Sequence, residues 1–580
     1  MYTDDKNAQI VLALLKKYNV KKIVISPGMT NVPISRSVQI DSFFETYSVV
    51  DERSAAYFAT GLAAESGEPV AISCTGATAS RNYLPALTEA YYRNLPIIAL
   101  TSQQATSDFG DFKPQYVNRA VTPLDVKRIS VNLPVIKDVE DEKSWVLAVN
   151  RALTMSIKNG CGPVHINLLV NSYSFTTGSL PEIARIDYFQ TEDLLNEEIL
   201  SQLKNQLKDK RIALLIGSHR KFSYEETKAI EQFVDSYDVA VFYDHTSNYK
   251  GKNRVLLSVA SGLKKIAIKP EIVLDIGGVT GVYSASGLLK NADFWRISED
   301  GEFHQRYGNL KNQFFCSEFV FFTKLASHTG GKRENKYYNA IKEKVGNVVI
   351  PELPFSNIFV SSQMASNLPE NSSFHIGASE SLSCMNFFEL KDSIDSSCNV
   401  GTMGIDGAVS TLVGQSMVNK EKLYFGQFGD LTFFYDMNAL GNRHICNNLR
   451  ILLINNGRGV RFRVTDVIEK PFGNEIDEFI SAGGHFGSAE GWGRSMGFEY
   501  FSASNKAEFL SLIDDFCDPD LRRFDRPVLF EVFTEVEDEQ EGLKIFRAIN
   551  TPATEMFRVK EIAKQLLPQN AVDVLKKLKK

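Results

Sequence analysis

Short apolar runs alternate along the chain with segments that mix apolar and polar positions. In the first third, the apolar runs KKIVISPG, PVAISCTGA, LPIIALTS and GPVHINLLV are bounded by Gly, Pro or Ser, which is typical of buried strands. Between them, NAQIVLALLKKY and SRNYLPALTEAYYR show the three-to-four-residue apolar spacing of helices. This alternation predicts an α/β protein whose helices pack on parallel sheets.

The same alternation restarts twice further along the chain. The middle third contains RIALLIGSHR, AVFYDH and PEIVLDIGG as strand patterns, and the last third contains SFHIGAS, KLYFGQFGD, LRILLINN and RPVLFEVFTE. The Ser/Thr-rich, aperiodic stretch NSYSFTTGSLPEIARIDYF predicts a linker near 172–190, and a second break falls near Pro351 and Pro354. We therefore predict three doubly wound parallel-sheet domains, at 1–185, 186–350 and 351–580, the last with a basic C-terminal tail, AVDVLKKLKK.

Length and composition narrow the class of protein. A chain of 580 residues is too long for one core, and 43% hydrophobic with 23% charged residues is ordinary for a globular protein. The net charge of −6 gives no support to nucleic-acid binding, and no apolar run approaches a membrane span of about 20 residues. The start has no signal-peptide pattern, and the seven scattered cysteines form no CxxC pair. We expect a cytoplasmic protein that binds neither nucleic acid nor membrane.

One candidate site lies at the carboxyl ends of two strands in the last third. Asp430 follows KLYFGQFG and opens a helix, while Asn455 and Asn456 end the next strand. In a doubly wound sheet these ends meet at one edge, where ligands bind. A carboxylate, an amide oxygen and a backbone carbonyl suit Mg²⁺ with a phosphate, and Gly429 lets the backbone approach that phosphate. The alternative interpretation is a helix-capping Asp followed by an Asn-Asn-Gly turn.

A second candidate is the charged triplet in VVDERSAAYFAT. The preceding FETYSVV predicts a strand end and Ser54 onwards predicts a helix, so Asp51, Glu52 and Arg53 occupy a strand-to-helix turn. One interpretation makes Asp51 the helix cap, with Glu52 and Arg53 in a solvated first turn. The other holds that Glu52 is kept away from water for chemistry.

Together these two features resemble the signature of thiamine diphosphate (ThDP) enzymes, in which a Gly-Asp motif precedes Asn-Asn and a glutamate follows the second N-terminal strand. The resemblance implies ThDP and Mg²⁺ as cofactors, with Asp430, Asn456 and the Arg458 carbonyl as metal ligands. It also implies that Glu52 contacts the aminopyrimidine nitrogen of ThDP, which then acts as electron sink for decarboxylation of a 2-oxo acid. The three domains would be the pyrimidine-binding, central and diphosphate-binding domains.

A narrower resemblance is carried by the stretches VISPG, VDERSAAYFATGLA, CTGAT with NYLPALTEAYY, GIDG and GDLTFFYDMNAL. They are similar to a narrower family, the 2-succinyl-5-enolpyruvyl-6-hydroxy-3-cyclohexene-1-carboxylate (SEPHCHC) synthases of menaquinone biosynthesis. Enzymes of that family decarboxylate 2-oxoglutarate and add the product to isochorismate. The resemblance implies that Ile405 is an apolar wedge that bends the cofactor and that Gln115 contacts the reacting carbon. It implies further cofactor contacts at Thr75, Asn82, Ser379, Gly429 and Leu431.

Basic residues that serve the substrate carboxylates in this family are replaced in this chain. The replaced positions hold Met29-Thr30, Gln103-Gln104-Ala105, Ser286-Gly287 (on a looser alignment), Ser383 and Asn399-Val400-Gly401. A hydrogen bond to a charged group is worth about 1.5–3 kcal/mol, so losing three would cost on the order of 5–8 kcal/mol. We predict that the cofactor chemistry is kept and that the acceptor is different and less anionic. A genuine SEPHCHC synthase is the alternative.

The residues that replace these basic groups are less well defined by the sequence. Thr30 and Gln104 are candidate substrate contacts because they stand at replaced positions. GRGVRFRV carries Arg461 and Arg463 at alternate positions, and an extended segment would place both on one face to bind a carboxylate or phosphate. A solvated strand edge is the alternative. His485 in the Gly-rich SAGGHFGSAEGW is a candidate proton donor, although a lone histidine is more often structural, and His165 in GPVHINLLV is expected in the core.

The resemblance also bears on assembly and on competing classes. In the family, the glutamate and the metal motif meet across a subunit interface, which implies a homodimer or homotetramer with shared active sites. The expected substrates are a 2-oxo acid and an acceptor, and the expected reaction is decarboxylation with carboligation. Two other classes stay open: a ThDP-binding scaffold without turnover, and a flavin-using relative similar to acetolactate synthase. For the latter, the Gly-rich run DIGGVTGVYSASG is a weak signal.

Overall fold

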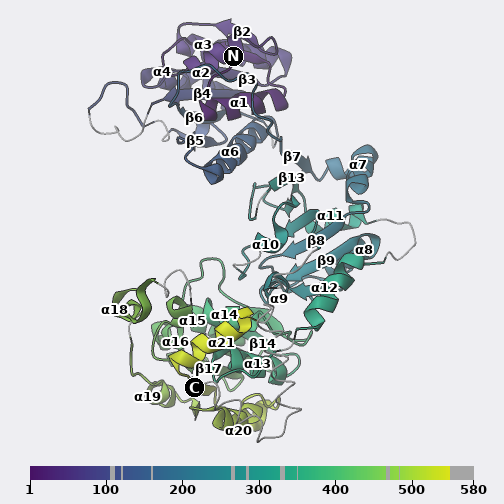
Figure 1. The fold of residues 1–580 in the computed structure, drawn as a ribbon, viewed down its shortest axis with the longest axis vertical. Coiled ribbons are helices and arrows are strands. Elements are labelled where there is room, and N and C mark those ends of the chain that lie inside the picture. Colours follow the sequence, from purple (N-terminus) through teal and green to yellow (C-terminus); the bar gives the residue numbers. More distant parts are fainter. Residues whose placement is uncertain are drawn as a thin grey trace, which may run out of the picture. The chain divides into compact units, whose positions relative to one another are not determined.

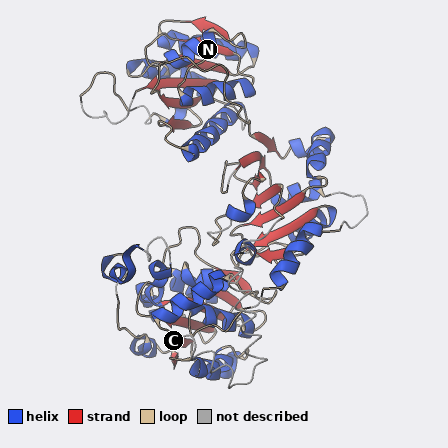
Figure 2. Ribbon diagram, viewed as in Figure 1, coloured by secondary structure: helices blue, strands red, loops and turns tan. Residues whose placement is uncertain are grey.

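The computed structural model describes residues 1–104, 112–118, 122–158, 161–262, 268–282, 286–307, 309–326, 334–348, 350–464, 471–482 and 484–548. The chain divides into two compact units: the first is Met1–Tyr188 with Lys311–Gln313, and the second is the rest. Three parallel sheets flanked by helices build these units (Figures 1 and 2). The predicted α/β class with three sheets is therefore confirmed, while the basic tail expected at 571–580 lies outside the described residues.

The first sheet is built from the buried apolar runs of the first third. Its strands follow the order β2-β1-β3-β4-β6-β5, and all neighbours are parallel. Strands β3, β4 and β6 are buried along their whole length, as their aliphatic residues predict. The elements are α1 Lys6–Lys17, β1 Lys22–Ile25, α2 Val32–Gln39, β2 Glu45–Ser48, α3 Glu52–Ser66, β3 Val70–Cys74, α4 Thr78–Asn82, α5 Leu84–Tyr92, β4 Ile97–Gln103, β5 Ser130–Leu133, α6 Val139–Ile157 and β6 Val164–Leu169.

The second sheet has the strand order β10-β9-β8-β11-β12-β13-β7. The linker predicted near 172–190 is wrong at its end, because the last four residues form β7 and join this sheet. A strand of that length is too short for its alternation to stand out from the polar residues around it. The elements are β7 Asp187–Gln190, α7 Glu197–Leu207, β8 Arg211–Ile216, α8 Tyr224–Ser236, β9 Asp238–Tyr243, β10 Arg254–Leu256, α9 Leu257–Gly262, β11 Ile272–Ile276, α10 Ser286–Leu289, β12 Asp293–Ser298, β13 Asn309–Phe315, α11 Glu318–Leu325 and α12 Lys336–Gly346.

The third sheet has the parallel order β15-β14-β16-β17-β19-β18. Because β15 lies on one side of β14 and β16 on the other, the strand order reverses at β14, where such sheets bind ligands. The strands are β14 Ser373–Ile376, β15 Asp395–Ser397, β16 Tyr424–Gly429, β17 Leu449–Asn455, β18 Glu499–Ala503 and β19 Val528–Phe533. The α-helices are α13 Asn357–Asn367, α14 Glu380–Met385, α15 Ala408–Ser416, α16 Asp430–Tyr435, α18 Ile476–Phe479, α19 Glu490–Ser495, α20 Lys506–Phe516 and α21 Val536–Ala548.

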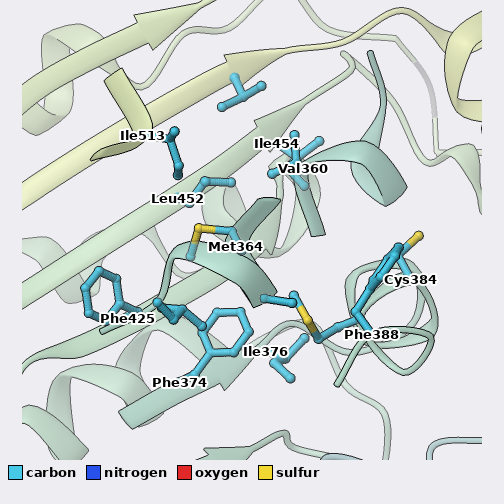
Figure 3. Close-up of a cluster of buried hydrophobic side chains, with 14 of the residues drawn as sticks. Val360, Met364, Phe374, Ile376, Cys384, Phe388, Phe425, Leu452, Ile454 and Ile513 are labelled. Atoms are coloured by element: carbon cyan, nitrogen blue, oxygen red, sulfur yellow. The ribbon is translucent and has the colours of Figure 1, made fainter. Parts of the chain in front are cut away.

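One face of the third sheet carries a dense apolar core that fixes the strands leading to the candidate site. Side chains from helices α13, α14 and α20 pack there against β14, β16 and β17 (Figure 3). The labelled members are Val360, Met364, Phe374, Ile376, Cys384, Phe388, Phe425, Leu452, Ile454 and Ile513. Burial of this apolar surface anchors the strand ends, so the loops after them begin from fixed points.

Polar contacts join the second and third sheets within the second unit. His245, which follows β9, is buried with its Nε2 3.1 Å from the Met385 carbonyl and 2.8 Å from the Phe388 carbonyl. Burial lowers the pKa of His245 to about 4, so the ring is a neutral donor at neutral pH. Lys221 also pairs with Asp395 of β15 at 2.7 Å. The two sheets therefore share one compact unit, and the boundaries at 185/186 and 350/351 stay predictions.

Among the described helices, none combines the length and the apolar character needed to cross a membrane. All seven cysteines are free.

Candidate active site

Asp430 is the first residue of α16, at the carboxyl end of β16, and only 3% of it is exposed. A Cβ built on Gly429 would meet no atom within 4 Å, so there is open space beside this strand end. Asp430 Oδ1 accepts a hydrogen bond from the Leu431 N–H at 2.7 Å, and Oδ2 lies 3.2 Å from His485 Nε2. Burial raises the pKa of the Asp430 carboxyl, and the Leu431 N–H and His485 oppose that rise. A buried carboxylate beside open space suits a cation ligand.

The loop after β17 reaches the same carboxylate, as predicted. The Gly457 N–H lies close enough to Asp430 to lower the pKa of its carboxyl, and Gly457 has a φ of 76°, in the left-handed region that favours glycine. Asn456 is half-buried, and its Oδ1 accepts from the Arg458 N–H at 3.3 Å. No three His, Cys, Asp or Glu side chains gather into a metal site among the residues that the structure describes. A metal here would combine one carboxylate with amide and backbone oxygens, and that donor set fits Mg²⁺.

His485 approaches Asp430 from the loop that precedes α19. Its backbone N–H donates to the Gly457 carbonyl at 2.8 Å, and its ring Nδ1 accepts from the Gly487 N–H at 3.1 Å. Because Nδ1 accepts, Nε2 carries the proton in this arrangement and can donate to Asp430. The ring also packs edge-to-face on Phe434, with 5.1 Å between centroids. The structure thus places His485 against the Asp430 carboxylate, and its role as a proton donor stays a prediction.

The segment GRGVRFRV is not extended, so the prediction of two arginines on one strand face is wrong. Val460–Val464 forms the 3-10 helix η4, and the left-handed turn at Gly457 ends the strand direction before it. Because a 3-10 helix has three residues per turn, side chains two positions apart point in different directions. Arg461 and Arg463 therefore cannot act as one anion-binding pair.

Each of these arginines faces an acidic side chain. Arg461 Nη1 lies 3.1 Å from Glu380 Oε2, at the start of α14. Arg463 Nε donates to Asp477 Oδ1 at 2.9 Å, and Arg458 pairs with the same carboxylate. The two guanidinium groups beside Asp477 hold its pKa below the usual range.

Ser379 and Ile405 are two further predicted cofactor contacts that belong to the third sheet and its helices. Ser379 follows β14, the neighbour of β16, and therefore stands at the same sheet edge. Its φ of 68° is unusual for a residue with a side chain, and such strain clusters at functional sites. Ile405 is half-buried in the turn before α15, which packs on β16 and α16. The wedge role of Ile405 stays a prediction.

The first unit holds Glu52 at the N-terminus of α3. Asp51 Oδ1 accepts from the Ser54 N–H at 3.0 Å, so Asp51 is the helix cap, as predicted. Glu52 is half-buried, and its Oε2 accepts from Asn82 Nδ2 at 3.4 Å. Its own unit therefore does not withdraw the Glu52 carboxylate from water.

Three other predicted residues gather at the same edge of the first sheet, after β1, β3 and β4. Thr30 Oγ1 donates to the Ser102 carbonyl at 2.6 Å and lies 2.5 Å from Thr75 Oγ1. Gln104 Oε1 accepts from the Tyr116 hydroxyl at 3.2 Å. Gln115 lies on the following loop with a φ of 71°, while Ala105 lies outside the described residues.

His165 is a core residue, as predicted: its ring bonds to the Thr101 hydroxyl at 2.6 Å and to the Ser130 hydroxyl at 2.8 Å. Sequence reasoning missed Glu380, Asp477 and Glu531, which hold the segments around Asp430. For Glu531 a signal existed, because it is a lone carboxylate inside the apolar strand pattern of RPVLFEVF. Glu380 and Asp477 carried no such signal, since their arginine partners are distant in sequence.

Comparisons with known proteins identify the class of this enzyme. Residues 5–125 match the family model described as the thiamine pyrophosphate enzyme, N-terminal TPP binding domain. The SEPHCHC synthase of Bacteroides thetaiotaomicron is 30% identical over 94% of this chain and 98% of its own length. That of Bacteroides fragilis strain ATCC 25285 is 31% identical over 94% of this chain and 99% of its own.

A solved structure, the Rhodococcus jostii RHA1 thiamine diphosphate-dependent 4-hydroxybenzoylformate decarboxylase, covers 91% of this chain and 99% of that chain. Its identity is 14% and its TM-score 0.42, values too low to place any residue. The sequence matches and the three-sheet fold define a ThDP-dependent enzyme. Given the identity and coverage of the two synthases, the chain belongs to the SEPHCHC synthase family.

Proposed function

We propose that this enzyme is a ThDP- and Mg²⁺-dependent 2-oxo-acid decarboxylase and carboligase whose acceptor is less anionic than isochorismate. The observation that carries the proposal is the buried Asp430 at an open strand end, in contact with the loop that holds Asn456. When bound with Mg²⁺, ThDP supplies the electron sink for the loss of CO2.

In this proposal the residues of the third sheet bind and orient the cofactor. Asp430, Asn456 and the Arg458 carbonyl would hold Mg²⁺, and the start of α16 from Gly429 to Leu431 would face the diphosphate. Ser379 and Ile405, at the neighbouring strand end and turn, would support the rest of the cofactor. His485 would hold the Asp430 carboxylate in orientation through its Nε2–H.

The residues of the first sheet would act on the reacting end. Glu52, held by Asn82, would exchange a proton with the pyrimidine nitrogen, and this role needs a carboxylate removed from water. Thr75 would contact the cofactor, and Gln115 the reacting carbon. Thr30 and Gln104 would contact substrate as neutral hydrogen-bonding groups.

The charged groups in the segment 458–463, after β17, support a less anionic acceptor. Arg461 is engaged by Glu380, and Asp477 is shared by Arg458 and Arg463. A second polyanionic substrate would have to compete with these carboxylates for the guanidinium groups. A genuine SEPHCHC synthase is the second candidate, favoured by the two synthases that match this chain over almost their whole length.

We further propose a cytoplasmic homodimer or homotetramer in which Glu52 serves a cofactor bound by Asp430 of another chain. The half-exposed Glu52 supports this arrangement, as do nearby exposed apolar side chains: Val50 is 80%, Tyr57 46% and Phe58 43% exposed. Such side chains are typical of surfaces that another chain covers.

Release of CO2 from a panel of 2-oxo acids tests the reaction, followed by an acceptor panel that includes isochorismate and neutral aldehydes or ketones. We expect release that requires both ThDP and Mg²⁺, and coupling to a neutral acceptor. Coupling to isochorismate alone would establish the second candidate. ThDP binding without release from any 2-oxo acid would favour the scaffold class.

Complementation tests the shared site. Glu52→Gln and Asp430→Ala proteins are each expected to be inactive, whereas mixed oligomers regain part of the activity because one of their sites is intact. A mixture that stays inactive after subunit exchange has been verified would contradict the shared site.

A further inference from the structure

Glu531 is a buried carboxylate in the middle of β19, with none of its surface exposed. Its hydrogen-bond partners in the structure are neutral donors. Oε1 accepts from Asn455 Nδ2 at 2.8 Å, and Oε2 accepts from the Ser488 hydroxyl at 2.8 Å and the Tyr500 hydroxyl at 2.7 Å. The Ala489 N–H lies 3.0 Å from both oxygens. Burial and the bond to Glu531 raise the pKa of Tyr500, so its hydroxyl remains a donor.

One of these partners, Asn455, leads directly to loop 456–459, which follows β17. Asn455 ends β17 and precedes the metal-ligand candidate Asn456. Its Oδ1 accepts from the Gly457 N–H at 3.2 Å, so the side chain held by Glu531 also fixes the left-handed turn of the loop. The same N–H lies close enough to Asp430 to lower the pKa of its carboxyl.

The other partners lead to the loop that carries His485. Ser488 and Ala489 end this loop at the start of α19, and the Asn455 amide also donates to the Gly487 carbonyl at 2.8 Å. At its other end, the His485 N–H donates to the Gly457 carbonyl at 2.8 Å. Both loops around Asp430 are therefore attached to the same carboxylate, that of Glu531.

We infer that Glu531 is a positioning residue of the metal site, which locks loop 456–459 and loop 484–489 together so that their polar groups meet at Asp430. The inference rests on the proposed Mg²⁺–ThDP site. A carboxylate can accept all of these donors, whereas a glutamine of the same shape would point an amide N–H2 at one set of them. The two loops would then lose their common anchor.

The test compares Glu531→Gln with Val532→Ala in the full-length protein. Val532 is the next residue of β19 and packs in the apolar core on the opposite face of the sheet, so its truncation weakens the fold without touching either loop. Two quantities are measured: the Kd for Mg²⁺ at saturating ThDP by calorimetry, and amide hydrogen exchange of residues 484–489 without cofactor. The informative amide is that of His485, which does not itself contact Glu531.

We expect Glu531→Gln to raise the Kd for Mg²⁺ by roughly 10–100-fold, as losing a group that orients metal ligands does. Exchange at His485 should become faster, and Val532→Ala should leave both quantities at parental values. Parental Kd and exchange in Glu531→Gln would overturn the inference, since a merely structural role moves neither. If Glu531→Gln does not fold, Ser488→Ala and Tyr500→Phe decide: each should raise the Kd by a smaller factor, and unchanged values in both overturn the inference.

The same measurements separate this inference from the proposed function. A parent protein that binds no Mg²⁺–ThDP would refute the proposed function. Amide hydrogen exchange at His485, measured without cofactor, would still decide whether Glu531 holds the two loops together. Faster exchange in Glu531→Gln supports this role, and unchanged exchange overturns it.

Discussion

Asp430 and Glu52 occupy equivalent positions in two different sheets, since each is the first residue of a helix that follows a parallel strand. Their surroundings differ sharply. Asp430 is 3% exposed and is contacted by Leu431, Gly457 and His485. Glu52 is half-buried, with an Asn82 contact at 3.4 Å, on a surface that exposes apolar side chains. One chain thus builds the metal half of the proposed site completely and leaves the glutamate half open.

This difference separates two kinds of function in the proposed site. The groups around Asp430 are held by loops anchored on buried strands, so a variant there should act on cofactor binding. In the proposed site Glu52 would gain its working environment from a bound cofactor and a second chain, so a variant there should act on the chemical step.

Glu52→Gln should lower kcat by about 10²–10⁴-fold, the range of a lost proton-transfer group, while the Kd for Mg²⁺–ThDP stays within a few-fold of the parent. The amide keeps the shape and the contact with Asn82 and removes the proton exchange. Decarboxylation rate and calorimetry measure the two quantities. Glu65→Gln, an exposed change on the same helix, is the control and should alter neither. Turnover near the parental value in Glu52→Gln would refute the role of Glu52.

Asp430→Asn should raise the Kd for Mg²⁺–ThDP by roughly 100-fold or more, because it removes the charged ligand of a hard cation. Because burial raises the pKa of Asp430, the cofactor-free variant should unfold at no lower denaturant concentration than the parent. Calorimetry and chemical unfolding test the two parts. Asp525→Asn, at an exposed aspartate of the same unit, is the control. Parental affinity in Asp430→Asn would place the metal elsewhere.

The sequence predicted the central strands better than the edges of the sheets. Long apolar runs mark β3, β4, β16 and β17, because both faces of a central parallel strand are buried. The edge strand β15, Asp395–Ser397, is short and polar, and local pattern gives it no signal. The strand end before Asp430 was predicted in the same way, because its apolar run stops abruptly, whereas the edge strand β2 before Glu52 was predicted from its aromatic and β-branched residues.

The side-chain partners in the site were beyond sequence reasoning. Alternate arginines in GRGVRFRV suggested a strand, yet the turn at Gly457 produces a 3-10 helix instead. The acids that engage Arg461 and Arg463 come from α14 and α18, and only the fold brings them near. A local pattern can thus locate a strand end, while long-range packing decides which charges remain available there.

Glu539 of α21 is another buried carboxylate in the unit of Asp430, and burial affects its pKa more strongly. It accepts from the Asn357 N–H at 2.9 Å and the Thr534 hydroxyl at 2.7 Å. Burial raises the pKa of Glu539 to about 8 from 4.5. The unfolded chain releases this proton near pH 4.5 and the folded chain near pH 8, so stability falls as pH rises through that window.

The slope is at most about 1.4 kcal/mol per pH unit for one proton. Urea unfolding between pH 7 and 8 measures this slope. His245 does not contribute in that range, because its lowered pKa causes a loss of stability only as pH falls below about 6.5. Glu539→Gln should flatten the slope, because an amide does not titrate. An unchanged slope in this variant would assign the proton to another group.

Asp51 should give the smallest effect, because it acts on Glu52 only through the helix. Asp51 Oδ1 accepts from the Ser54 N–H, and losing that bond should loosen the first turn, where Glu52 stands. We expect Asp51→Ala to speed amide exchange at Ser54 and to lower kcat a few-fold. Asp51→Asn should leave both unchanged, since asparagine caps equally well. If exchange at Ser54 rises in the alanine variant and kcat does not fall, then the cofactor or the second chain holds Glu52 in place without help from the cap, and the open half of the site is completed entirely from outside.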